Sequence, residues 1–140
     1  MTATTEITMS QVVHAPPEQV YAAWLDPDQL ATWWWPQIPD TTYELDAVVG
    51  GGYRIRSEAA GMGVHGTVVA LEEPHRIELT WVWEDGDEHG LEERVVVHLA
   101  AHGHGTELTV RHWTESEGAD DFRQGWTDCL ERLVVVEALS

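Results

Sequence analysis

The chain contains 140 residues, the usual length of one domain, and its 25 acidic residues against seven arginines give a formal net charge of −18. Because proteins bind nucleic acids through lysine and arginine side chains that neutralise phosphates, and anionic membrane surfaces repel so acidic a chain, we exclude both as partners. A single cysteine, Cys129, excludes a disulfide framework. The sequence shows no signal peptide and no apolar run long enough to cross a membrane, so we expect a cytoplasmic protein without membrane insertion.

The first third of the chain predicts one strand and two short helices. Apolar and polar residues alternate over residues 6–13, which is typical of a strand. Pro17 suits the first turn of a helix, because its missing N–H costs nothing there, and an apolar stripe that includes Trp24 continues this helix to about residue 25. Pro27 then begins a second short helix that runs to Trp34.

From about residue 42 the apolar residues recur with a period of two, which predicts a series of antiparallel strands. Residues 84–88 and 102–105 are the turns of two hairpins. The chain closes with an amphipathic helix of about 18 residues that begins near Asp120. A single long helix must lay its apolar stripe on the apolar face of the sheet, so residues 1–140 are predicted to form one α+β domain.

Short motifs are spread along nearly the whole chain. In chain order they lie at residues 15–16, 26–30, 33–35, 51–53, 73–77, 80–81, 105–109 and 125–126. In these motifs the chain resembles the START/Bet v 1-like (SRPBCC) superfamily, and within it the branch named after the activator of the heat-shock-protein-90 ATPase. The resemblance implies a helix-grip fold, in which a curved antiparallel sheet of about six to seven strands wraps around the long C-terminal helix and encloses a cavity. It does not imply one activity, because members of the superfamily carry lipids and hormones, cyclise polyketides or serve other roles.

Eight tryptophans in a chain of this length are the main sign of a binding site. Aromatic side chains supply large contact areas, and ligand pockets are mostly apolar, so we expect several inward-facing residues to line the cavity. The alternative is that the same residues only pack the core. The three tryptophans of residues 33–35 cannot all point inward in this interpretation, so at least one lies at an opening or a contact surface. The predicted ligand-binding residues are Trp24, Tyr53, Trp81, Trp83, Leu108, Val110, Phe122 and Trp126.

Two polar residues are candidates for catalysis. His112 shares a strand face with Leu108 and Val110, and Glu93 shares one with Val95, so an imidazole and a carboxylate could enter one cavity as general acid and base. The alternative places Glu93 at the solvated rim and makes His112 a hydrogen-bonded core residue.

Other polar side chains favour structural roles. Arg54 and Arg56 alternate with apolar residues and could clamp a ligand carboxylate, or form surface ion pairs. Cys129 is expected to be a small core residue. The glycine pattern of residues 61–66 precedes a strand and therefore is no dinucleotide fingerprint. His98, His102 and His104 could suggest a metal site, but His98 is predicted to point away from the valine face of its strand and the other two lie in a hairpin turn. We expect neither a metal nor a cofactor.

Three functions remain open. The first is binding of a small apolar molecule, aromatic or lipid-like, which requires a cavity of at least roughly 300 Å³. The second is a cofactor-free cyclase, dehydratase or hydrolase that uses the same cavity, with His112 and Glu93 moving protons. The third is a co-chaperone-like interaction module that presents the exposed part of residues 33–35. A homodimer stays open as the assembly.

Overall fold

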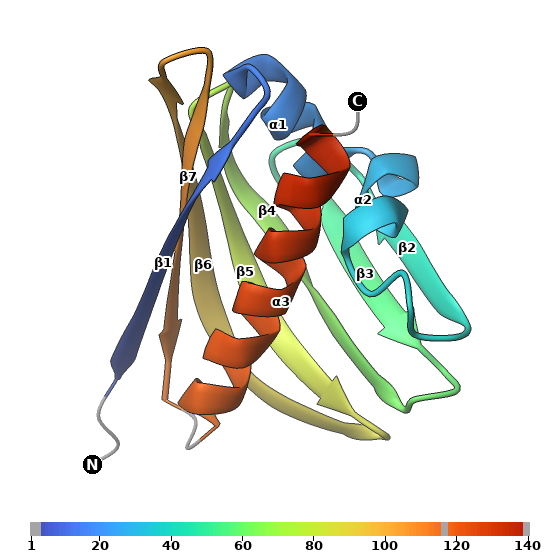
Figure 1. Cartoon of the computed structure of the whole chain (residues 1–140). Coiled ribbons are helices and arrows are strands. Elements are labelled where there is room, and N and C mark those ends of the chain that lie inside the picture. The colour runs from blue at the N-terminus through green and yellow to red at the C-terminus, as the bar shows by residue number, and fades with distance from the viewer. Residues whose placement is uncertain (1–3, 116–117, 139–140) are drawn as a thin grey trace.

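The computed structural model of the protein describes residues 4–115 and 118–138, which form a seven-stranded antiparallel sheet and three helices (Figure 1). Across the sheet the strands follow the order β1-β7-β6-β5-β4-β3-β2. In chain order the elements are β1 (Thr5–Val13), α1 (Pro17–Leu25), α2 (Pro27–Trp33), β2 (Thr41–Leu45), β3 (Gly52–Ser57), β4 (Met62–Glu72), β5 (Arg76–Asp85), β6 (Glu88–His102), β7 (Gly105–Thr114) and α3 (Ala119–Ala138).

The long helix α3 lies across one face of the curved sheet, and α1 and α2 lie beside its C-terminal end (Figure 1). The helix buries a stripe that includes Trp126, Leu130 and Leu133 against the sheet, as the three- and four-residue spacing predicts. This arrangement confirms the predicted helix-grip fold. Among the described residues, no helix has the length and apolar character needed to span a membrane.

The strand register explains which side chains meet under α3. Trp81 of β5 lies opposite Glu93 of β6, and Val95 of β6 lies opposite His112 of β7. Side chains two residues apart on a strand point to the same face, so Trp81, Glu93 and His112 all point toward the helix. Three strands thus bring one aromatic, one acidic and one imidazole side chain to the same part of the inner face.

The opposite face of the sheet contains the ion pairs of Arg54 and Arg56, which the sequence analysis expected as one alternative, but their acidic partner Glu84 is buried, which it did not expect. Glu84 is 1% exposed. It lies in strand β5 and not in the turn predicted for residues 84–88, and a β-bulge interrupts the pairing of β5 with β6 beside it. Arg54 donates two hydrogen bonds to its carboxylate at 3.1 and 2.9 Å, and Arg56 donates one at 2.7 Å. His65 Nδ1 lies 2.7 Å from the same carboxylate. Arg54 and Arg56 therefore bind a carboxylate of the chain itself.

These contacts control the ionisation of Glu84. Burial alone raises the pKa of its carboxyl, but the hydrogen bonds from Arg54, His65 and Arg56 outweigh burial and lower the pKa from 4.5 to about 2. The cluster ties strands β3, β4 and β5 together on the face away from α3.

Candidate functional site

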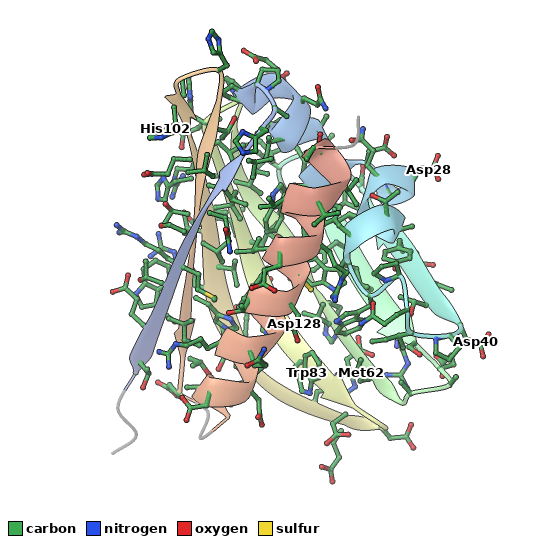
Figure 2. All side chains as sticks on the ribbon, in the orientation of Figure 1. Asp28, Asp40, Met62, Trp83, His102 and Asp128 are labelled. Atoms are coloured by element: carbon green, nitrogen blue, oxygen red, sulfur yellow. The ribbon has the colours of Figure 1, made fainter. Side chains whose placement is uncertain are left out.

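A cavity of about 210 Å³ lies between the N-terminal half of α3, strand β5 and the segment after α2. Figure 2 labels Trp83 and Met62 close together on the sheet at this end of the molecule. The cavity does not reach the roughly 300 Å³ that the sequence analysis required for a ligand pocket, so it is too small for the drug-sized ligands of typical pockets. Its wall is mostly aromatic and consists of Trp34, Trp35, Met62, Trp81, Trp83, Asp121, Phe122, Gly125, Trp126 and Cys129.

Local geometry places most of this wall. Trp81 and Trp83 are two residues apart on β5 and point to the same side of the sheet, with ring centroids 6.4 Å apart and planes inclined by 14°. On α3, Phe122, Gly125 and Cys129 follow one another at intervals of three and four residues, which puts them on one side of the helix. The cavity is therefore the gap between one strand face and one helix face.

The third part of the wall comes from the segment that follows α2. Trp33 ends the helix, Trp34 is extended, and Trp35 has a φ of 56°, which is unusual for so large a residue. This change of direction sets the Trp35 ring against Trp83, with centroids 5.9 Å apart and planes at 89°. All three tryptophans are buried, with exposed fractions of 0, 4 and 9%. We expected at least one of them at an opening or a contact surface; Trp34 and Trp35 line the cavity, and none of the three forms an exposed contact surface.

The His112–Glu93 pair lies directly behind the cavity wall. The indole N–H of Trp126 donates to His112 Nδ1 at 3.1 Å, and His112 Nε2 lies 2.8 Å from a carboxylate oxygen of Glu93. An indole nitrogen can only donate, so the histidine proton is on Nε2 and is donated to Glu93. The side chain of His112 is completely buried and is not part of the cavity wall.

Glu93 is held in its charged form. Burial alone raises the pKa of its carboxyl, but hydrogen bonds from His112 and Thr114 outweigh burial and lower it. Glu115 also donates its backbone N–H to Glu93 at 3.3 Å. The result is a linear chain of hydrogen bonds from Trp126 through His112 to Glu93, which fixes the position of the Trp126 ring in the wall.

Cys129 is the one nucleophilic sulfur of the sequence and lies in the wall. Burial raises the pKa of its thiol to about 11, although the Arg132 guanidinium lies 3.6 Å from the sulfur and acts in the opposite direction. Arg132 also donates to the Trp33 carbonyl at 3.0 Å. The thiol is therefore protonated at neutral pH and contributes to the cavity as an apolar group.

Four of the eight predicted ligand-binding residues lie in the cavity wall, namely Trp81, Trp83, Phe122 and Trp126. The other four lie outside it. Trp24 packs behind Trp126 with ring centroids 6.0 Å apart, and the Tyr53 hydroxyl donates to the Thr80 carbonyl. Leu108 and Val110 are buried in the core.

The sequence analysis did not assign six further wall residues to the site. Gly125 and Cys129 share the helix face of Phe122, so helical spacing could have identified both. Asp121 lies four residues before Gly125, so the same spacing could have identified it. Met62, Trp34 and Trp35 reach the wall from β4 and the segment after α2 through the tertiary arrangement, for which no local signal exists. Among residues 4–115 and 118–138, no three histidine, cysteine or acidic side chains are grouped to hold a metal ion.

Residues 14–137 match the sequence pattern of the family described as Activator of Hsp90 ATPase homolog 1-like protein. The chain belongs to this family. A search among curated proteins finds no match.

Solved structures show the same fold. Protein CV1439 from Chromobacterium violaceum is 27% identical, with a TM-score of 0.77 over 93% of this chain and 95% of that one. CalU16 from Micromonospora echinospora is 25% identical, with a TM-score of 0.72 over 94% and 75%. The Aha1 dimer from Colwellia psychrerythraea, solved in solution, is 20% identical, with a TM-score of 0.76 over 93% of each chain.

Proposed function

We propose that this family member binds a small aromatic molecule, of one ring or two fused rings, in the cavity between β5 and α3. The observation that carries this proposal is a wall of five tryptophans and one phenylalanine around about 210 Å³. An engineered apolar cavity of about 150 Å³ binds benzene, so this volume holds a substituted ring. A long lipid does not fit the cavity as it stands, which favours the aromatic over the lipid-like ligand.

The polar network supports a binding role. Because Trp126, His112 and Glu93 hold one another in fixed positions, the wall is formed before a ligand arrives. A preformed site loses little side-chain entropy on binding, and this is the usual state of small-molecule pockets.

Two measurements together test the proposal. Native mass spectrometry of freshly purified, untagged protein is compared with the denatured mass, and calorimetry follows titration of the protein with tert-butylbenzene, a neutral single-ring probe. We expect either a reproducible adduct of one small molecule or saturable one-to-one binding of the probe. Protein that carries no adduct and produces no binding heat contradicts the proposal.

An enzymatic use of the same cavity is the second candidate, and the contact between His112 and Glu93 favours it. Both ring nitrogens of His112 are already engaged, so Trp126 must rotate before His112 can exchange a proton with a ligand. A ligand that is turned over by the native protein, but not by a His112→Gln variant that still binds it, would support this candidate.

The family's description and the dimeric relative suggest a protein partner or a second copy. In this chain residues 33–35 are buried, so they offer no surface for a partner. A homodimer remains a prediction that sedimentation equilibrium can test.

A further inference from the structure

The charged side chains around the cavity are acidic. Asp121, in the first turn of α3, lines the cavity itself. A neighbouring hollow of about 260 Å³ shares Trp83 and Phe122 with the cavity, and Glu93 and Glu115 line it. Among the described residues, neither wall contains an arginine or a histidine.

Two basic side chains contact wall residues, and both are engaged elsewhere. Arg132 donates to the Trp33 carbonyl and contacts the Cys129 sulfur, and His112 donates its proton to Glu93 behind Trp126. A ligand with a carboxylate or phosphate in the cavity would therefore meet the carboxylate of Asp121 and, among the described wall residues, no basic side chain. Glu93 and Glu115 add two more carboxylates in the neighbouring hollow, and the protein has a formal net charge of −18. The structure disfavours an anion in this cavity.

The wall of the cavity consists mainly of aromatic rings. The indole N–H groups of Trp34 and Trp81 are closed off from solvent, and that of Trp126 is donated to His112. The rings meet at steep angles, with 89° between Trp35 and Trp83 and 73° between Trp83 and Phe122. Rings at such angles surround the space from several directions.

Ring faces carry the negative part of the aromatic quadrupole, and a cation within about 6 Å of a ring centroid is attracted to it. Tryptophan is the strongest of the aromatic side chains in this respect, and sets of aromatic rings are used to recognise quaternary ammonium groups. From the aromatic wall, the carboxylate of Asp121 beside it and the absence of basic wall residues in the described part of the chain, we infer that the ligand is an organic cation, a small aromatic or alkyl amine. Its ammonium group lies against the tryptophan faces on the side of Asp121.

This inference rests on the proposed function, and one pair of probes separates the two. Phenyltrimethylammonium and tert-butylbenzene have the same shape, but the first has a positively charged nitrogen where the second has a carbon atom. We expect the cation to bind the protein about tenfold more tightly than its neutral counterpart. If tert-butylbenzene binds equally well or better, the cation inference fails and the proposed function stands. If neither probe binds, both fail.

Two neighbouring acids provide a matched pair of variants. Asp121 lines the cavity, whereas Asp120 has a side chain that is 97% exposed and is paired with Arg123 at 3.2 Å. Both lie in the first turn of α3, so both variants remove the same favourable interaction with the helix dipole. We expect Asp121→Asn to lower the ratio of the two probe affinities about threefold, and Asp120→Asn to leave it unchanged. An unchanged ratio in Asp121→Asn would remove Asp121 from the ammonium site.

Discussion

Gly125 offers a way to close the cavity without damaging the fold. It lies in the cavity wall within α3, and a Cβ atom built at this position meets no atom within 4 Å. Glycine inside a helix costs about 1 kcal/mol relative to alanine, and leucine is close to alanine in helix propensity. Gly125→Leu and Gly125→Ala should therefore both raise the free energy of unfolding by about 0.5–1 kcal/mol, or the Tm by about 3 °C.

The two variants differ in what they leave of the cavity. A leucine at position 125 adds four carbon atoms to the cavity and takes up about half of the 210 Å³. The volume that remains is smaller than the cavity of about 150 Å³ that binds benzene, so it does not hold tert-butylbenzene. In calorimetry, we expect the affinity of Gly125→Leu for tert-butylbenzene to be lower than that of the wild type by roughly 30-fold or more. Gly125→Ala should bind the probe like the wild type. A Gly125→Leu protein that melts above wild type and still binds within threefold would refute the assignment of the cavity.

Three further predictions concern the polar groups of the fold. The contribution of Glu84 to the free energy of unfolding is present above pH 4.5 and is lost as the pH falls to about 2. Over this range the free energy of unfolding of the wild type, measured in urea titrations, should fall by about 3 kcal/mol more than that of Glu84→Gln. Parallel pH profiles of the two proteins would contradict this. His112→Leu leaves the Trp126 N–H without an acceptor and removes one hydrogen-bond donor from Glu93. In urea denaturation this variant should lower the free energy of unfolding by about 3 kcal/mol. A loss below about 1 kcal/mol would argue against the hydrogen-bond network. The Cys129 thiol, with its raised pKa, should not react with an aromatic disulfide reagent at pH 8 until the protein is unfolded, and rapid reaction of the native protein would show that the thiol is accessible.

The fold could be predicted because its signals are local and repeat along the chain. Alternation on β5 and β7 identified the inner face, and three- and four-residue spacing identified the buried stripe of α3. The same alternation placed His112 and Glu93 on one face, where the structure joins them by a hydrogen bond. Their participation in catalysis stays a prediction.

The shape of the cavity could not be predicted from such signals. It depends on the positive φ of Trp35, which turns the segment after α2 inward, and on the place where Met62 meets β5. Neither follows from the pattern of neighbouring residues. The burial of Glu84 was missed for a related reason, because its three partners come from strands β3 and β4 and only the tertiary fold brings them together.

The tryptophans themselves provide the most direct test of the aromatic site. Each of the eight gives one indole N–H resonance in a ¹⁵N-correlated NMR spectrum, and single tryptophan-to-phenylalanine variants assign them. On titration with tert-butylbenzene, we predict that the resonances of the five wall residues shift together and saturate at one equivalent, whereas that of Trp113, stacked under Arg94 away from the wall, stays in place. Saturable shifts confined to Trp113, or a spectrum that does not change, would contradict an aromatic-binding cavity in this protein.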